Sequence, residues 1–259
     1  MSDKFSVAAV IPAHLASVRF PGKILYEFFG IPMIEHVRRR ALLCDSLSKV
    51  YVATCDDQIA SKVQSFGGDV ILTSPSHKNG TSRVSEAVSN IGCSHVLLLQ
   101  GDEPLILPQH ITSMVNAMAA SPEVHSWNAT GPLTSHLELD LHSFVKCSIN
   151  SRGRIMHCFR RSPCYSKFDH QKLFIRKILG LIAYRRDFLL SLSHLPPSIF
   201  DNYESIEQMK IIENDFSLYS VPVSPSLPSV NEPSDADKIY SYVRDNVDQK
   251  SLLDTVLSY

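Results

Sequence analysis

The segment Pro12–Lys23 carries two cations at a spacing suited to a phosphate-bearing ligand. It reads PAHLASVRFPGK and follows an apolar run directly, so one loop brings together backbone N–H groups and the side chains of Arg19 and Lys23. An arginine holds phosphate through two parallel hydrogen bonds, whereas a lysine acts as a point charge. The segment matches neither glycine-rich nucleotide-binding pattern, G-x-x-x-x-G-K-[ST] or G-x-G-x-x-G. It predicts a phosphate-binding loop of another kind, and a solvated basic surface loop is the alternative.

A second segment, Gln100–Pro104, places a carboxylate at the end of an apolar run. It reads QGDEP and follows HVLLL. Magnesium is typically held by one or two carboxylates together with substrate phosphates, so Asp102 is the predicted metal ligand. Gly101 is expected to let the backbone approach a ligand closely. A strand-ending turn is the alternative, because Asp, Gly and Pro are common there.

The third segment, His77–Arg83, groups polar side chains around Gly80. It reads HKNGTSR and offers Asn79, Thr81 and Arg83. Thr81 is the predicted N-cap of the helix that follows. A helix N-terminus with free N–H groups also binds ligands, so the capping and binding roles are compatible.

Short apolar runs alternate with helical periodicity through the first half of the chain. The runs predict strands at Phe5–Ile11, Lys49–Thr54, Asp69–Leu72 and His95–Leu99. Helices are expected at Ile34–Leu43, Gln58–Phe66, Ser82–Asn90 and Gln109–Ala119. This alternation is typical of βαβ units with parallel strands and right-handed crossovers. Ligands bind outside the carboxyl ends of such strands, where all three polar segments lie.

The second half of the chain has a different pattern. Strands are expected at Phe144–Asn150 and Ile155–Phe159 around a hairpin turn, and at Ile178–Tyr184. Helices are expected at Asp187–Leu192, Ser205–Ile212 and Asp235–Val247, with a proline-rich loop at Ser224–Pro233. The prediction is a single α/β domain over 1–259, with a mostly parallel twisted sheet and helices on both faces. A smaller mixed insert, about 120–185, is expected to close the site.

Composition excludes several classes of protein. Lys+Arg number 25 and Asp+Glu 26, giving a net charge of −1, which argues against a nucleic-acid binder. No stretch approaches the ~20 apolar residues of a membrane span. The six cysteines lack metal-finger spacing and are expected to be buried free thiols of a reducing cytosol. The eleven histidines show no metal-binding pattern, and Trp127 is expected to pack in the core or at a dimer interface.

Taken together, the motifs resemble the 3-deoxy-manno-octulosonate cytidylyltransferase family, which activates a lipopolysaccharide sugar acid as its CMP ester. Ile11–Lys23 is similar to the family pattern I-P-A-R-x-x-S-x-R-x-P-G-K, and Gln100–Pro104 matches its Q-G-D-E-P in full. Further similar segments keep their order: Gly30–Ile34, His77–Arg83, Val145–Lys146, Phe159–Pro163, Ala183–Asp187 and Ile206–Gln208.

The resemblance implies a nucleotide-diphospho-sugar transferase-like fold and a magnesium-dependent transfer of CMP from CTP to a sugar acid. It implies catalytic roles for Arg19, Lys23 and Asp102. The nucleotide would be bound by a set of residues comprising Ala13, His14, Arg19, Lys23, Asn79, Gly80, Thr81, Arg83 and Gln100. The acid would be bound by Gln100, Arg161, Tyr184, Glu207 and Gln208, and Mg²⁺ by Asp102 and Asn231. A cytoplasmic homodimer is also implied.

Four residues depart from the family pattern. His14 stands in place of an arginine, Ile178 in place of a histidine, Ile182 in place of an aromatic residue, and Asn231 in place of an aspartate. These departures leave two alternatives open beside the octulosonate enzyme. One is the same CTP chemistry on a different acid, such as another ulosonate or a phosphonate. The other is a weakened nucleotide-binding homologue that acts as a regulator or partner subunit.

Overall fold

The computed structural model describes residues 5–259, and their contacts divide the chain into two compact units. The first unit comprises the chain up to Thr112 together with Leu227–Tyr259, and the second comprises Ser113–Ser226. The predicted insert, 120–185, lies within the second unit. A single domain over the whole chain stays a prediction. Each unit is described by itself.

The first unit contains four parallel strands in the order β5-β4-β1-β6. Their bounds are Val7–Ala13 (β1), Lys49–Thr54 (β4), Asp69–Leu72 (β5) and His95–Leu99 (β6). Ala8 pairs with Lys49 of β4, and Val7 pairs with His95 of β6. Both β1 and β6 are buried along their whole length, as continuous apolar runs in parallel sheets are expected to be.

The helices of this unit follow from the strand order. They are α1 (Met33–Leu42), α2 (Asp57–Ser65) and α3 (Gly80–Val88). The chain moves from β1 to β4 to β5 in one direction and then returns from β5 to β6, so right-handed crossovers place α3 on the opposite face from α1 and α2. The order therefore reverses between β1 and β6, which is where open α/β sheets bind ligands.

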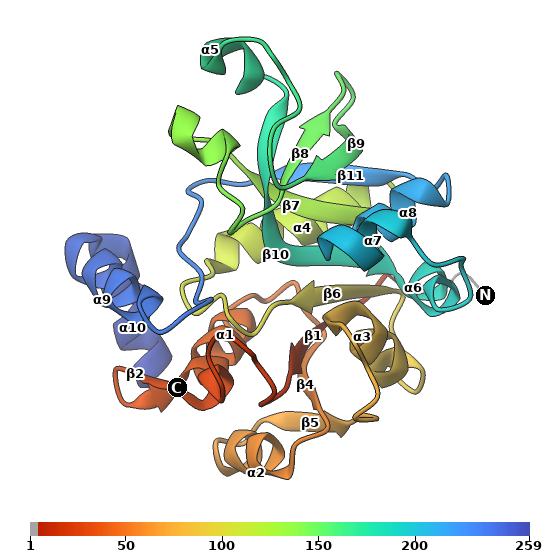
Figure 1. Ribbon diagram of the computed structural model, residues 1–259. Coiled ribbons are helices and arrows are strands. Elements are labelled where there is room, and N and C mark those ends of the chain that lie inside the picture. Colours follow the sequence, from red (N-terminus) through yellow and green to blue (C-terminus); the bar gives the residue numbers. More distant parts are fainter. Residues whose placement is uncertain (1–4) are drawn as a thin grey trace. The chain divides into compact units, whose positions relative to one another are not determined.

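Several smaller elements complete the first unit (Figure 1). A short helix η1 (Lys23–Leu25) and a two-stranded ribbon of β2 (Glu27–Phe28) and β3 (Ile31–Pro32) follow the loop after β1. The chain ends in α9 (Asp235–Asp245) and α10 (Val247–Leu257), which contact each other and, through α10, helix α1. Helix α4 (Pro108–Ala120) begins in the first unit and ends in the second.

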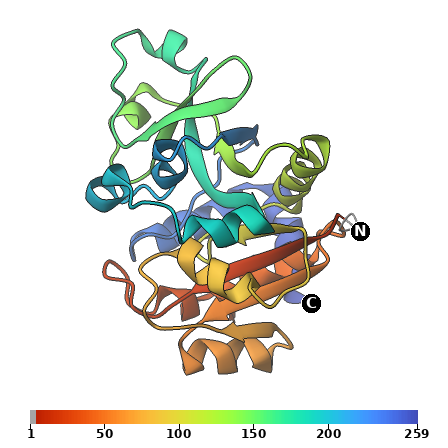
Figure 2. The same ribbon diagram turned by 90° about the vertical axis from the view of Figure 1, so that its right-hand side faces the viewer.

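The second unit is built on a mixed sheet in the order β10-β7-β11-β9-β8. Its strands are β7 (Ser126–Gly131), β8 (Lys146–Ile149), β9 (Arg154–Phe159), β10 (Ile175–Arg185) and β11 (Leu218–Pro222). Only the β7–β11 pair is parallel. Strand β10 pairs with β7 over one part and with β8 over another, and both views of the ribbon show the bend between these parts (Figure 1 and Figure 2). Its helices are η2 (His136–Leu139), α5 (Phe168–Gln171), α6 (Arg186–Leu192), α7 (Ile199–Glu204) and α8 (Met209–Glu213).

The predicted elements of the first half and the β8–β9 hairpin are confirmed, with small shifts at their ends. The helix predicted at Ser205–Ile212 is wrong at its start, because Ser205 adopts φ 53° and ends α7, and α8 begins only at Met209. The helix predicted to run to Val247 ends at Asp245, and α10 follows it. None of the helices within residues 5–259 has the length and apolar character that a bilayer crossing requires. All six cysteines are free, but Cys55, Cys93 and Cys164 are only half-buried.

Candidate nucleotide-binding site

The loop after β1 is folded onto itself by backbone hydrogen bonds. The carbonyl of Leu15 accepts from the amides of Ser17 and Gly22, and Gly22 adopts φ 70°, a conformation that favours glycine. The amide of Leu15 donates to Oδ2 of Asp56 at 2.9 Å. Asp56 follows the end of β4, so a neighbouring strand end holds the loop in place.

An ion pair joins this loop to the end of β6. Nζ of Lys23 lies 2.6 Å from Oδ2 of Asp102 and 2.8 Å from the carbonyl oxygen of Val230. The amide of Val230 donates back to the carbonyl of Asp102 at 2.9 Å. Three segments that are distant in sequence therefore meet at one partly buried cation.

Arg19 lies beside the same group of residues. Its Nη2 donates to Oδ1 of Asn231 at 3.1 Å. The amides of Asn231 and Glu232 both donate to Oδ2 of Asp235, the first residue of α9. Burial acts to raise the pKa of Asp235, but hydrogen bonds from Lys238 and these two amides outweigh it, and the pKa is lowered. Asp235 thus fixes the loop that carries Asn231.

The start of α3 corrects one prediction. Its N-cap is Asn79, whose Oδ1 accepts from the amide of Ser82 at 2.9 Å, and Thr81 lies inside the helix. Asn79 is the N-cap because it directly precedes the first helical residue, Gly80, and its side chain reaches the third amide of the helix. Arg83 is buried and donates to the hydroxyl of Thr73 at 2.6 Å.

The loop after β1, the start of α3 and the end of β6 line one cavity of about 540 Å³. Seven of the residues predicted from the sequence lie in its wall: His14, Lys23, Asn79, Gly80, Arg83, Gln100 and Asp102. Ala13, Arg19, Thr81 and the predicted metal ligand Asn231 lie outside the lining. Gly101 is also in the wall, and a Cβ there would lie 2.9 Å from Cδ1 of Ile24 and 3.3 Å from the carbonyl oxygen of Pro12, so packing within the protein favours glycine at this position.

His14 occupies the cavity as a neutral group near pH 7. Burial lowers its pKa, and the positive charge of Arg83 lowers it further, with Lys23 adding to this effect. The carboxylates of Asp56 and Asp102 oppose the shift but do not cancel it. The imidazole therefore supplies no positive charge to the resting cavity.

The loop that follows Asp102 is held from beneath by buried side chains. Nε2 of Gln249, on α10, donates to the carbonyl of Leu105 at 2.8 Å, and Gln249 is buried. Nη1 of Arg40, on α1, donates to the next carbonyl, that of Ile106, at 3.3 Å. The last helix of the chain thus anchors the strand end that carries the acidic residue.

Apart from Gln100, the residues predicted to bind the acid lie in the second unit, in varied surroundings. Tyr184 is buried in β10, and Arg161 is exposed and pairs with Asp140 at 3.0 Å. Glu207 and Gln208 are half-buried in the segment between α7 and α8. Nε2 of Gln208 donates to Oδ1 of Asn128 at 3.1 Å.

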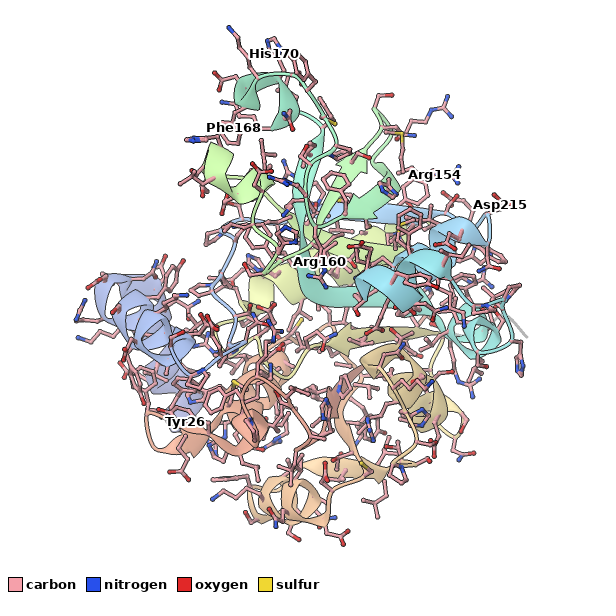
Figure 3. The ribbon with its side chains drawn as sticks, in the orientation of Figure 1. Tyr26, Arg154, Arg160, Phe168, His170 and Asp215 are labelled. Carbon is pink, nitrogen blue, oxygen red and sulfur yellow. The ribbon has the colours of Figure 1, made fainter. Side chains whose placement is uncertain are left out.

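Arg160 braces the segment that leads to these two residues (Figure 3). Its three nitrogens donate to the carbonyls of Glu204, Ser205 and His142 at 2.9–3.3 Å. The guanidinium thereby ties the end of α7 to the loop before β8.

Two braces of the cavity were not predicted from the sequence. Asp56 lies two residues after the end of a predicted strand, so the rule of strand carboxyl ends that selected the other segments applies to it as well. Asp235 gave no such signal, because only the folded loop shows that its carboxylate turns back to Asn231. Within residues 5–259, no three His, Cys, Asp or Glu side chains gather closely enough to form a metal cluster by themselves.

Comparison with known proteins identifies the family. Residues 8–218 match the family model described as cytidylyltransferase. This chain belongs to the cytidylyltransferase family. It is a nucleotidyltransferase of the α/β class, as the motifs predict.

Individual relatives narrow the likeness. The chain is 36% identical to a 3-deoxy-manno-octulosonate cytidylyltransferase of Geobacter sulfurreducens, over 90% of this chain and 98% of the relative. It is 33% identical to an 8-amino-3,8-dideoxy-manno-octulosonate cytidylyltransferase of Shewanella sediminis, over 89% and 95%. A solved structure of a CMP:2-keto-3-deoxy-manno-octonic acid synthetase complexed with CTP aligns with a TM-score of 0.87 and 32% identity, covering 93% of this chain and 99% of that one.

Proposed function

We propose that this chain transfers CMP from CTP to 3-deoxy-manno-octulosonate and releases pyrophosphate. The observation that carries the proposal is the Lys23–Asp102 pair in the wall of the cavity, where the strand order reverses. A cation and a carboxylate at one point suit a ligand that bears both phosphates and a metal ion. The names of the relatives support the choice of CTP and of an octulosonate.

The phosphates of CTP would be bound by the loop after β1. Lys23 and Arg19 supply positive charge there, and the backbone next to Ala13 and the imidazole of His14 supply further contacts. The nucleoside would contact the start of α3 and the end of β6 through Asn79, Gly80, Thr81, Arg83 and Gln100. Because Oδ1 of Asn79 caps the helix, this side chain has its Nδ2 group to offer a ligand.

The donors near Lys23 fit a magnesium ion. Asp102 and Asn231 supply a carboxylate and an amide oxygen, and Mg²⁺ in proteins uses one or two such groups together with substrate phosphates. The ammonium of Lys23 already lies against two oxygens there, those of Asp102 and Val230, so the place accepts a cation. Bound there, the ion would neutralise the charge that develops on the phosphates.

The reaction follows from this arrangement. A hydroxyl oxygen of the acid attacks the α-phosphorus of CTP, the hydroxyl proton passes to solvent, and the bond between the α-phosphorus and the oxygen that bridges to the β-phosphorus breaks. Lys23 and Arg19 stabilise the negative charge of the leaving pyrophosphate. Within the second unit, the acid would be held by four residues, namely Arg161, Tyr184, Glu207 and Gln208.

A related acid is the second candidate substrate. Ile178 and Ile182 replace polar or aromatic residues of the family pattern, and Ile182 is buried. The likeness to a cytidylyltransferase named for an 8-amino octulosonate is nearly as high as that to the others. Both observations favour comparing the two acids directly.

The test is pyrophosphate release by the purified protein with CTP, Mg²⁺ and a panel of ulosonates. We expect release with the octulosonate and none with UTP. Thermal stability in CTP, UTP, ATP or dTTP gives a separate readout, because a true ligand at a hundredfold excess over its dissociation constant stabilises by about 2.7 kcal/mol. Stabilisation by CTP without release on any acid would favour the nucleotide-binding homologue.

We also propose that the protein acts as a homodimer in the cytoplasm. The six free thiols are consistent with a reducing compartment. Light scattering on the purified protein tests the dimer, and cell fractionation tests the location.

A further inference from the structure

We infer that Asn128, which lies outside every predicted site segment, orients the carboxamide of Gln208 so that its oxygen faces a hydrogen-bond donor of the sugar acid. The inference rests on the proposed function and concerns the second unit alone. It makes Asn128 a positioning residue for substrate selection.

The orientation of the Asn128 amide is fixed by its surroundings. Nδ2 lies 2.8 Å from the carbonyl oxygen of Ala129 and 3.0 Å from that of Leu179. Carbonyl oxygens only accept hydrogen bonds, so the NH₂ group of Asn128 must face them. The side chain is fully buried, and water has no access to replace these bonds. Reversing the amide would bring three oxygens together without a proton.

A bulge explains why Leu179 needs this partner. In the β7–β10 ladder, Thr130 pairs with Ile178 and Asn128 pairs with Ile182, so three residues of β10 lie opposite Ala129 alone. Such extra residues leave ladder groups unpaired. Asn128 satisfies one of these carbonyls, and the bulge it holds is bordered by the two isoleucines that depart from the family pattern.

The fixed amide then determines how Gln208 is turned. Oδ1 of Asn128 only accepts, so the atom of Gln208 that lies 3.1 Å away must be the donor Nε2. Oε1 of Gln208 therefore points away from Asn128. It accepts no hydrogen bond from the protein between residues 5 and 259, and the side chain is only half-buried.

An oriented oxygen selects the chemistry of its ligand. It accepts from a hydroxyl or an ammonium group and repels a carboxylate. Gln208 would therefore recognise a hydroxyl or amine of the acid, and the carboxylate of the acid would have to bind elsewhere, at a cation such as Arg161. An acid that lacks the recognised hydroxyl is expected to bind about tenfold more weakly.

The experiment compares Asn128→Ala with Thr130→Ala. Thr130 is equally buried on β7 and bonded to Ser220, so it controls for the loss of a hydrogen bond in this strand. We expect Asn128→Ala to raise KM for the octulosonate about tenfold while KM for CTP stays unchanged. Added to Gln208→Ala, it should raise KM no further. Equal effects of Asn128→Ala and Thr130→Ala on KM for the octulosonate would overturn the inference. Additive effects of Asn128→Ala and Gln208→Ala in the double variant would also overturn it.

A second variant covers the case in which Asn128→Ala does not fold. Gln208→Glu changes a half-buried side chain and offers two acceptor oxygens, one of which would face Oδ1 of Asn128. We expect it to raise KM for the acid as much as Gln208→Ala does. A KM close to that of the wild type would show that Gln208 is not oriented by Asn128. Failure of the proposed function is distinct, since the wild-type protein itself would then release no pyrophosphate, and the inference would fall with it.

Discussion

In the first unit the candidate site contains charged side chains that bond to neighbouring groups of the site, whereas in the second unit it includes a neutral amide whose partner is held by buried backbone carbonyls. Lys23 is bound by Asp102 and by a carbonyl, and Arg19 by Asn231. Gln208 is bound by Asn128, which is bound in turn by Ala129 and Leu179. Charge suits the phosphates that every CTP-dependent reaction shares. Oriented neutral groups suit discrimination between acids.

Under the proposed function, the first unit would carry out the chemical step and the second would select the acid. A variant of the cavity that changes the order of preference among acids would contradict this division of roles. Variants of the second unit that change the order of preference among acids, and leave KM for CTP unchanged, would support it.

The largest effect is expected from Asp102→Asn. It removes the only negative charge of the pair with Lys23 and should lower kcat by about a hundredfold to a thousandfold, equally for every acid. Steady-state kinetics with two ulosonates measures this. Lys49→Ala, which removes an exposed ion pair with Asp69 at the N-terminal end of β4, is the control and should leave kcat unchanged. A change in the ratio of the two acids would contradict the division of roles.

His14→Arg is expected to strengthen CTP binding about tenfold at pH 8, because it adds a permanent charge where the wild type has a neutral imidazole. The pKa of His14 is lowered, so the wild-type residue gains charge only on acidification below its usual range. Calorimetry from pH 8 to pH 5.5 should show binding to the wild type becoming tighter relative to the variant. The variant also controls for titration of the γ-phosphate of CTP. Parallel pH profiles of the two proteins would refute a role for His14.

Asp235→Asn tests the brace of the Asn231 loop through stability. Its pKa is lowered in the folded protein, so its stabilising contribution is present above the unfolded-state pKa and is lost as pH falls through the lower folded value. We expect the variant to lose about 1–2 kcal/mol of unfolding free energy at pH 7 and much less at pH 3. Urea denaturation at both values measures the difference. Asp245→Asn, an exposed carboxylate at the end of α9, should cost little at either pH.

The smallest effect is expected from Ile178→His in the second unit. Introducing the polar residue of the family pattern should lower KM for the octulosonate by about three- to tenfold, the value of one hydrogen bond, and leave KM for CTP unchanged. Competition between the octulosonate and its 8-amino counterpart reports the ranking. An unchanged ranking would place Ile178 outside the acid site.

The sequence predicted the first unit well because its two central strands, β1 and β6, are buried and apolar along their whole length. It did not predict β7, whose residues Ser126, Asn128 and Thr130 are polar yet fully buried. Each has a hydrogen-bond partner that lies 51 to 91 residues away in the sequence. The spacing of apolar residues cannot reveal such a partner, so these polar residues gave no signal of a buried strand. The cavity residues could be predicted because they follow the carboxyl ends of apolar strands. The roles of Asn128 and Asp235 depend on contacts that only the folded structure shows.

Helix α10, near the end of the sequence, supports the loop that carries Asp102 in the first half. Gln249 lies well outside every motif, yet it supports the turn immediately beyond Asp102. Shortening the protein by its final thirteen residues would withdraw that support while leaving all the recognisable motifs intact. We therefore expect such a truncated protein to retain every motif of the family in an alignment and to have a lower kcat than the full chain.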